Sequence, residues 1–172
     1  SLPIGIVLAL GRRSRMPALR AICVMMIEFF RGVPLITLLF VASSMLTYFL
    51  PPGTNFDLLL RVLIMVTLFA SGYIAEVVRG GLQGLSSGQY ESADSLGLTY
   101  WQAHRLIILP QALKISIPGI VNTFIGLYKD TTLVLIIGML DILGLGRARA
   151  TDPDWMGLEP ELYIFVALFF FL

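Results

Sequence analysis

Long apolar stretches alternate with short polar ones along the chain. Leu2 to Leu10 carries no charge, and Ala21 to Leu50 carries only Glu28 and Arg31. Leu58 to Val78 is a third apolar stretch. A run of roughly 18 or more apolar residues with few charges is typical of a membrane-spanning helix. The pattern therefore predicts an end of one span followed by two complete spans.

Two further stretches extend this pattern toward the end of the chain. Lys114 to Gly138 is apolar apart from Pro118 and the polar group at residues 129–132, and Leu162 to Leu172 is apolar throughout. We expect an all-α integral membrane protein with about five transmembrane helices, the first and last of them truncated. Residues 1–172 are expected to form a single transmembrane domain.

The stretch from Ala21 to Leu50 is too long for a straight span. As a helix it would measure about 45 Å at 1.5 Å per residue, against a hydrocarbon core of about 30 Å. It must therefore tilt, bend or begin as a helix in the membrane interface. Gly32-Val33-Pro34 is the predicted break point, because proline disrupts a helix interior.

The longest polar interruption, residues 86–110, predicts two short helices that meet at an angle. Gly97 suits the left-handed residue that ends the first helix, and Pro110 is predicted to end the second. Two residue pairs have the spacing of a capping box: Ser86 with Gln89, and Thr99 with Gln102. Between two spans, such a segment would form an aqueous docking loop, which we define as residues 81–111.

The number of crossings places the docking loop on the same side as the first polar loop. That loop is rich in arginine: Arg12, Arg13, Arg15 and Arg20. Residues 51–56 and the mixed, acidic segment 139–161, predicted to contain a short surface helix, would lie on the opposite side. Because positively charged loops face the cytoplasm, we predict a cytoplasmic docking loop and a periplasmic 139–161 segment.

Composition agrees with a membrane protein and excludes several kinds of site. Hydrophobic residues make up 57% of the chain and charged residues 13%. The single Cys23 excludes an intrachain disulfide, and one histidine with one cysteine excludes a conventional His/Cys zinc cluster. The chain has no P-loop motif, so we expect no ATPase site of that kind. We predict no catalytic residue, metal or cofactor in this chain.

Several charged residues are predicted at membrane depth, where each costs at least about 2.5–3.5 kcal/mol. One interpretation is a pocket for a zwitterion. Arg31 would bind the carboxylate, Asp130 or Glu28 the ammonium, and Thr131 would add an oxygen near a helix break. The alternative is a Glu28–Arg31 salt bridge, three residues apart on one helix, that only stabilises the bent helix.

Other polar or small residues are interpreted as structural. Glu76 and Arg79 are expected to form an ion pair near the cytoplasmic end of their span. His104 is expected to face solvent or a partner. Three glycines with small-xxx-small spacing are expected to serve close helix packing: Gly80, Gly84 and Gly88.

The docking loop resembles a motif of known transporters. Residues 91–93 are Glu-Ser-Ala, Gly97 follows after three residues, and Ile-x-Leu-Pro at 107–110 follows after nine more. This is similar to the E-A-A-x3-G-x9-I-x-L-P loop of permease subunits in binding-protein-dependent ABC importers. Ser92 is the one departure. The resemblance implies that these residues couple the chain to an ATPase: Glu91, Ser92, Ala93, Gly97, Ile107, Leu109 and Pro110.

Other stretches narrow the resemblance. Residues 28–35, 73–81 and 129–133 look like the polar amino-acid branch of these permeases, and Asp152-Pro153-Asp154-Trp155 looks like general L-amino-acid permease subunits of Gram-negative bacteria. The resemblance implies a multi-pass protein of the bacterial inner membrane that transports amino acids. Its implied partners are two ABC ATPase subunits, a second permease subunit, identical or paralogous, and a periplasmic amino-acid-binding protein.

In this interpretation ATP and Mg²⁺ are bound by the partner ATPase. The chain itself would contact lipid and amino-acid substrate but no nucleic acid, and would not be an enzyme. Two other classes stay open from the sequence. One is a secondary transporter driven by an ion gradient, and the other is a structural membrane subunit that transports nothing.

Overall fold

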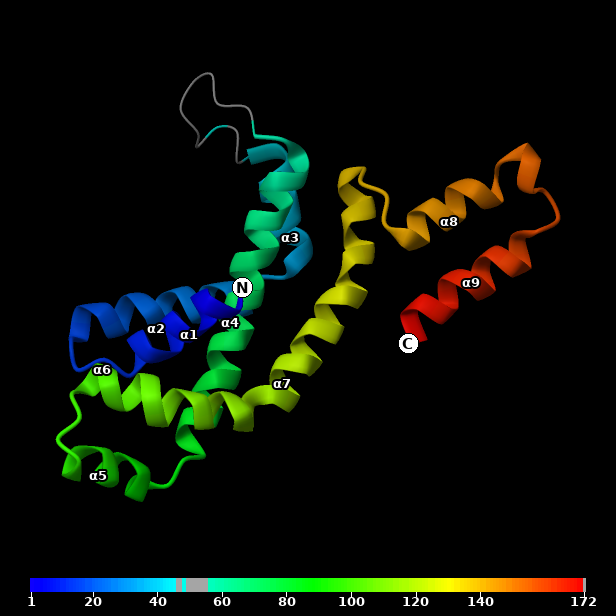
Figure 1. The fold of residues 1–172 in the computed structure, drawn as a ribbon. Coiled ribbons are helices and arrows are strands. Elements are labelled where there is room, and N and C mark those ends of the chain that lie inside the picture. Colours follow the sequence, from blue (N-terminus) through cyan, green and yellow to red (C-terminus); the bar gives the residue numbers. More distant parts are fainter. Residues whose placement is uncertain (46–47, 49–55, 172) are drawn as a thin grey trace.

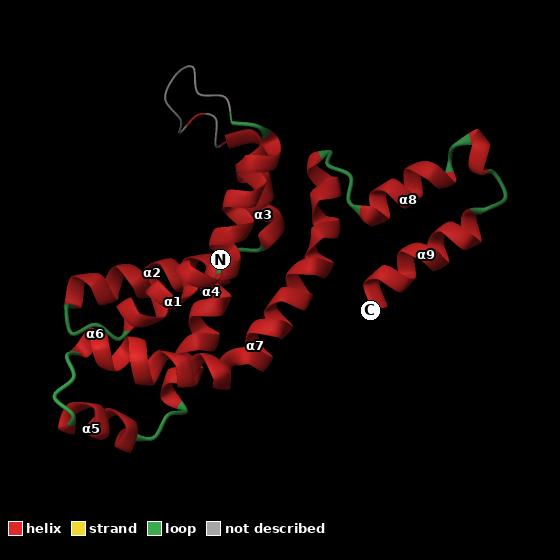
Figure 2. Ribbon diagram, in the orientation of Figure 1, coloured by secondary structure: helices red, strands yellow, loops and turns green. Residues whose placement is uncertain are grey.

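Every regular element in the described part of the chain is a helix (Figures 1 and 2). The computed structural model describes residues 1–45, 48 and 56–171. The predicted all-α fold is confirmed. The elements are α1 (Leu2–Arg12), α2 (Pro17–Gly32), α3 (Leu35–Phe40), the π-helical η1 (Val41–Met45), α4 (Leu58–Gln83), α5 (Ser87–Ser95), α6 (Tyr100–Ala103), the π-helical η3 (His104–Ile108), α7 (Leu109–Asp130), the 3-10 helix η4 (Thr131–Ile137), α8 (Ile142–Ala150), the 3-10 turn η5 (Pro153–Trp155) and α9 (Glu159–Phe171).

Among the residues that the structure describes, two helical stretches are long and apolar enough to cross a membrane, as predicted for a multi-pass protein. They are α4, with 26 residues, and the continuous stretch Tyr100–Ile137, with 38 residues. The bent pair formed by α2 and Leu35–Met45 can supply a third span. The shorter apolar helices α1 and α9 occupy the positions of the predicted first and last spans.

The predicted break at Gly32-Val33-Pro34 is confirmed. The helices on either side of it meet at 99°. Val33 has extended backbone angles, φ −94° and ψ 129°, as expected for a residue that precedes proline. The overlong apolar stretch therefore divides into two helices of different direction.

Pro110 does not end the second helix of the docking loop, so this prediction is wrong. The helix continues from Tyr100 to Ile137, and Pro110 lies in the first turn of α7. The preceding turn, η3, is π-helical, and Leu109 N–H donates to the carbonyl of His104, five residues earlier. The Gln111 side chain also donates to Ile107 O at 3.1 Å. Pro110 directly follows the π-helical turn and lies in the first turn of the α-helical segment α7, where a proline breaks no hydrogen bond of that segment, so the helix tolerates it.

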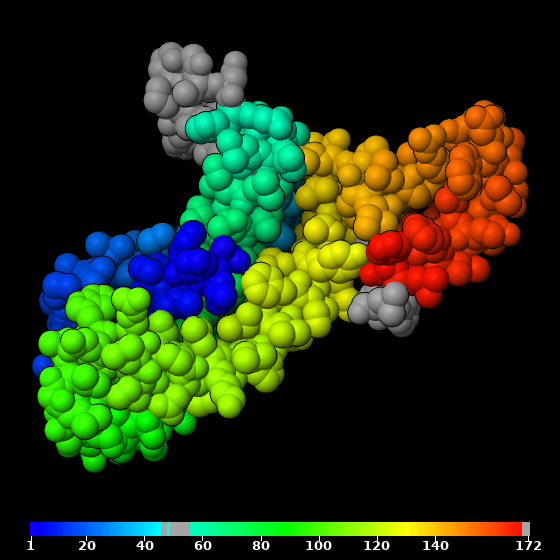
Figure 3. Space-filling model, viewed as in Figure 1, coloured from blue at the N-terminus to red at the C-terminus, as the bar shows by residue number. Residues whose placement is uncertain are grey.

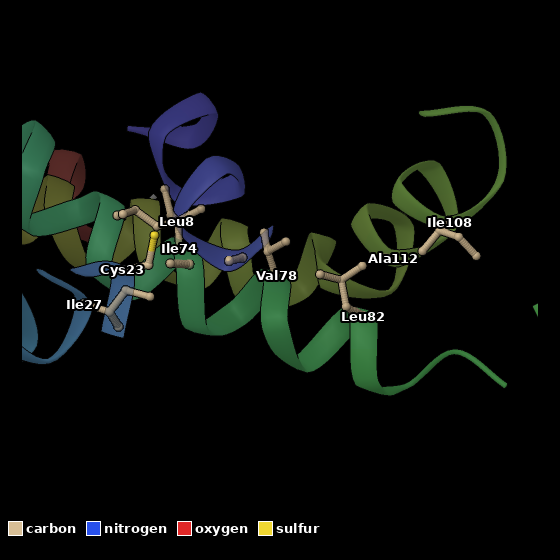
Figure 4. Close-up of a cluster of buried hydrophobic side chains, with 10 residues drawn as sticks. Leu8, Cys23, Ile27, Ile74, Val78, Leu82, Ile108 and Ala112 are labelled. Atoms are coloured by element: carbon tan, nitrogen blue, oxygen red, sulfur yellow. The ribbon is translucent and has the colours of Figure 1, made fainter. Parts of the chain in front are cut away.

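A buried apolar cluster holds the end of α4 that leads to the docking loop. Figure 4 shows side chains of α1, α2, η3 and α7 gathered around those of α4; the labelled residues are Leu8, Cys23, Ile27, Ile74, Val78, Leu82, Ile108 and Ala112. A second cluster, nearer the start of α4, joins Phe30, α3 and Phe69. Helix α4 is therefore the central element of the fold.

Helices α4 and α7 approach most closely at small residues. A Cβ atom on Gly81 would overlap Ser116 Oγ and the Ala112 carbonyl, and one on Gly119 would lie 2.7 Å from a Val77 methyl. The Ser116 hydroxyl also donates across the crossing to Val77 O at 3.2 Å. We call these five residues the α4–α7 crossing.

The predicted packing role of Gly80, Gly84 and Gly88 is not what the structure shows. A Cβ on Gly80 would meet no atom within 4 Å, and one on Gly88 would meet only its neighbour Ser86. A Cβ on Gly84 would make only an ordinary contact with Ile115, at 3.7 Å. The closely packed glycine of this region is the adjacent Gly81, which the predicted spacing does not include.

Helices α8 and α9 extend away from the remaining helices (Figures 1 and 3). The predicted short helix after residue 139 is α8, which Asp141 caps by accepting from Gly144 N at 2.8 Å. It follows η4, at the far end of the α7–η4 helix from the docking loop. Segment 139–161 thus begins at the opposite end of this helix from the docking loop, and its place on the other side of the membrane stays a prediction, whereas most of segment 51–56 lies outside the described residues.

Candidate functional site

The first helix of the docking loop ends as the sequence predicts. Gly97 has φ +68°, the left-handed conformation that favours glycine. Leu98 N–H donates to Ala93 O at 3.2 Å, and Gly97 N–H donates to Asp94 O at 2.9 Å. This is the Schellman arrangement, which satisfies the last carbonyls of α5. Gly97 thus turns the chain from α5 toward α6.

The two predicted capping pairs differ in outcome. Thr99 N–H donates to Gln102 Oε1 at 3.0 Å, as in the glutamine arm of a capping box. Ser86 directly precedes α5, but its hydroxyl makes no capping hydrogen bond. Only the second pair therefore contributes the predicted interaction at a helix start.

Most motif residues in the docking loop face outward. Glu91, Ser92 and Gly97 are exposed, whereas Ala93 is 1% exposed and packs against the rest of the protein. Ile107 and Leu109 are half-buried and Pro110 is exposed. Ala93 thus anchors α5 while its polar neighbours remain accessible.

The loop also carries an exposed apolar surface that the motif does not reveal. Its side chains are Leu96, Tyr100, Trp101 and Leu106, with Leu96 and Trp101 72% and 71% exposed. The ring centroids of Tyr100 and Trp101 lie 5.5 Å apart, and large apolar side chains that stay exposed within one loop are available to a protein partner. The cue available in the sequence was the presence of large apolar residues inside a polar segment.

His104 is buried, so the expectation that it faces solvent is wrong. Its Nδ1 atom lies 2.9 Å from Tyr100 O, and its ring centroid lies 4.0 Å from that of Tyr100 and 6.3 Å from that of Tyr90. Gln111 adds a hydrogen bond of 2.9 Å to Gln89. These contacts fix α5 against the helix that begins at α6.

Charged residues of three helices converge on Glu76. Arg12 of α1 lies 3.2 Å from this carboxylate, Arg31 of α2 lies 3.9 Å from it, and Arg79 donates to it from the next turn of α4. The predicted Glu76–Arg79 pair is confirmed. Glu28 pairs with Arg12 at 3.1 Å. No Glu28–Arg31 bridge is present between these two described residues.

A cavity of about 250 Å³ lies between α4 and α7. Its lining residues are Phe69, Tyr73, Asn122, Thr123, Gly126, Leu127 and Asp130. Asp130 is half-buried at the end of α7, where the α-helix changes into the tighter 3-10 helix η4. The predicted helix change beside Asp130 is therefore present.

Of the four substrate-binding candidates from the sequence, Asp130 alone lines this cavity. The Arg31 guanidinium lies over the ring of Tyr73, 5.9 Å from its centroid, where Tyr73 forms part of the wall. Thr131 donates to Tyr128 O at 2.7 Å and is not a lining residue. Glu28 is half exposed beside Arg12.

The cavity can hold a small polar molecule with a positive group. The Asp130 carboxylate accepts hydrogen bonds from an ammonium, and the aromatic faces of Phe69 and Tyr73 attract cations and apolar groups. Sequence reasoning missed Asn122 and Thr123, although both interrupt an apolar run. Thr123 and Asn122 lie seven and eight residues before Asp130 on one helix, about two turns, so the helical period places all three along one side.

The whole chain, residues 1–172, matches the family described as binding-protein-dependent transport system inner membrane component. The glutamate/glutamine/aspartate/asparagine transport system permease protein BztC of Rhodobacter capsulatus is 66% identical over 100% of this chain and 40% of that protein. The inner membrane amino-acid ABC transporter permease protein YhdY of Escherichia coli is 56% identical over 100% of this chain and 47% of that protein. The chain thus spans less than half of these two relatives.

The fold has a counterpart among solved structures. The crystal structure of an amino acid ABC transporter with histidines matches with a TM-score of 0.79 and 30% identity, over 99% of this chain and 77% of that one. Sequence and fold thus agree along the full length of the chain. This protein belongs to the family of inner-membrane components of binding-protein-dependent transport systems.

Proposed function

We propose that this chain is a permease subunit of an ATP-driven amino-acid importer in a bacterial inner membrane. The observation that carries the proposal is the docking loop, in which the motif residues Glu91, Ser92 and Gly97 lie exposed beside an apolar surface. Family membership and the names of the amino-acid permeases that the chain resembles support it.

The proposed partners follow from the two ends of the fold. The exposed apolar surface and motif residues of the docking loop would bind a cytoplasmic ABC ATPase subunit, which holds ATP and Mg²⁺. A periplasmic amino-acid-binding protein would approach the side of segment 139–161. A second permease subunit, identical or paralogous, would complete the translocation path.

The cavity between α4 and α7 is the proposed place of contact with the amino acid. Asp130 would bind the α-ammonium group. Arg31, on the other side of Tyr73, would move toward the cavity and bind the α-carboxylate through two parallel hydrogen bonds. Its 3.9 Å separation from Glu76 is longer than that of Arg12, so less attraction opposes this movement.

Reconstitution of the full complex tests this proposal. The natural full-length chain, its partner subunits and binding protein are placed in proteoliposomes, and uptake of radiolabelled L-glutamine and L-glutamate is measured. We expect uptake only when ATP is supplied on the side of the membrane that carries the ATPase subunits and the binding protein is present on the other side. Uptake driven by a proton or sodium gradient without ATPase subunits would indicate a secondary transporter. An assembled complex that moves no amino acid would indicate a structural subunit.

A further inference from the structure

The end of α1 is hydrogen-bonded to the docking loop. Arg13 Nη1 donates to the Tyr90 hydroxyl at 3.0 Å and to Leu82 O at 3.4 Å. The Tyr90 hydroxyl in turn donates to the same Leu82 carbonyl at 3.3 Å. The Arg13 guanidinium also lies 5.5 Å from the centroid of the Tyr90 ring. Helices α1, α4 and α5 therefore meet at one small polar junction.

The Leu82 carbonyl explains why this junction forms. It belongs to the last turn of α4, which ends at Gln83, and the carbonyls of a last turn have no partner within the helix. Arg13 and Tyr90 supply the missing donors. The positive charge of Arg13 is also favourable at the negative end of the α4 dipole.

Arg12, the residue before Arg13, contacts a different set of partners. Arg12 pairs with Glu28 of α2 at 3.1 Å and with Glu76 of α4 at 3.2 Å. Neighbouring residues on a helix point about 100° apart, so one short segment can hold two clusters at once. The end of α1 thus joins the docking loop on one side and the Glu76 ion pairs on the other.

The ion pairs continue as far as the cavity. Glu76 attracts Arg31 at 3.9 Å, and Arg31 lies over Tyr73, whose side chain lines the cavity between α4 and α7. A series of polar and ring contacts, joined through the neighbouring residues Arg12 and Arg13, therefore connects Tyr90 on the docking loop with the cavity wall. Its members come from α5, the end of α1, α4 and α2.

We propose that Arg12 and Arg13 transmit movement of the docking loop to the cavity, with Tyr90 and Arg13 as positioning residues. When the ATPase displaces α5, the Arg13–Tyr90 bond displaces the end of α1, and Arg12 then shifts Glu76 and with it Arg31. This inference rests on the proposed function, because it requires an ATPase at the docking loop.

The link to α1 is mechanically distinct from the covalent link to α4. Residues 84–86 between α4 and α5 are not helical, so the chain there can bend without moving α4. The Arg13–Tyr90 bond spans this break. Loss of that bond would let α5 follow the ATPase while α1 and the ion pairs stay behind.

A double-mutant cycle tests the link in the reconstituted complex. Tyr90→Phe removes only the hydroxyl, and Arg13→Gln removes the charge and the fork of donors. The measured quantity is L-glutamine or L-glutamate imported per ATP hydrolysed. We expect each variant to lower this ratio about fivefold, the lower end of typical couplings between sites, with KM for the loaded binding protein unchanged. The double variant should be no worse than either single variant.

Matched controls separate transmission from general damage. Arg15→Gln makes the same change on an exposed arginine two residues away, and Tyr163→Phe makes the same change on a half-exposed tyrosine of α9. Both should keep the wild-type ratio. Arg13→Lys, which keeps a charge and a donor, should restore part of the ratio and also serves if Arg13→Gln fails to assemble.

The outcomes also distinguish this inference from the proposed function. A wild-type complex that imports amino acids while Tyr90→Phe keeps the normal ratio overturns the link and leaves the proposed function intact. Additive losses in the double variant overturn it as well. A wild-type complex that imports nothing would contradict the proposed function itself.

Discussion

The α4–α7 crossing and the docking loop both depend on a glycine, for opposite reasons. At the crossing, Gly81 is buried and a Cβ atom there would overlap Ser116 and Ala112, although its backbone is ordinary helix. In the docking loop, Gly97 is exposed and a Cβ atom would meet nothing within 4 Å, but φ is +68°. One glycine supplies space and the other supplies backbone freedom.

This difference separates stability from coupling. At the crossing, any added side chain must push two spans apart, and the whole bundle bears the cost. In the loop, a side chain added at Gly97 would strain the backbone of that one residue, and the added atoms would meet only solvent or a partner. Substitutions at the crossing should therefore affect folding, and those in the loop should affect communication with the ATPase.

The largest expected effect is that of Gly81→Ala. Overpacking typically costs about 1–3 kcal/mol, and the upper end or more applies here because the new Cβ meets the Ala112 backbone. We expect a marked loss of folded protein extracted from membranes, and a lower Tm for what remains. Size-exclusion chromatography and thermal unfolding in detergent measure both.

Gly80→Ala is the matched control for this prediction. It makes the same change one residue earlier, where a Cβ would have no neighbour within 4 Å. Alanine favours a helix over glycine by about 1 kcal/mol, so Gly80→Ala should raise Tm slightly. Equal behaviour of the two variants would contradict the packing that we assign to Gly81.

Replacement of Glu76 should have the next largest effect. Glu76→Gln leaves Arg12, Arg31 and Arg79 without their shared carboxylate. Breaking a fully buried pair costs about 3–5 kcal/mol, and since Glu76 is 24% exposed we expect about 2 kcal/mol here. A lower Tm of the assembled complex would show it.

Glu28→Gln provides the comparison within the same cluster. Glu28 contacts one arginine and is 54% exposed, so its loss should cost about 0–1 kcal/mol. If Glu28→Gln lowered Tm as much as Glu76→Gln, the central position of Glu76 in the cluster would be wrong.

Local chemistry made much of the fold predictable from the sequence. The break at Val33-Pro34 and the left-handed Gly97 depend on the residues themselves and their immediate neighbours. The apolar stretches likewise show where the spans lie, because any segment inside the hydrocarbon of the membrane must be apolar, whichever helices it packs against. Such features need no knowledge of distant contacts.

The features that sequence reasoning missed depend on distant contacts. His104 is buried because Tyr90 packs against it from another helix, and Gly81 faces a neighbour because α7 lies on that side of α4. Arg12 reaches Glu76 across 64 residues of sequence. Pro110 was misjudged because a π-helical turn, invisible in the sequence, accommodates it.

In the cavity, Asp130→Asn should reduce transport without affecting assembly. The amide keeps the size of the side chain but cannot attract an ammonium by charge. We expect about tenfold slower uptake of L-glutamine, which corresponds to about 1.4 kcal/mol. Pull-down of the ATPase should be unchanged. Thr131→Val, at a neighbouring residue outside the cavity wall, should keep normal uptake, and unchanged kinetics in Asp130→Asn would make Asp130 a structural residue.

Gly97→Asp should have only a small effect on stability, about 1 kcal/mol. A left-handed backbone costs a non-glycine residue roughly 1–2 kcal/mol, and aspartate tolerates it better than most because its short side chain bonds locally. Membrane insertion and Tm should therefore change little, while ATP-driven uptake falls because α6 and the apolar docking surface change direction relative to α5. Gly88→Asp, on the same loop with ordinary helical backbone and open space around it, is the control. Normal uptake in Gly97→Asp would mean that the turn after α5 does not determine how the docking loop contacts the ATPase. Coupling would then depend on residues outside the motif.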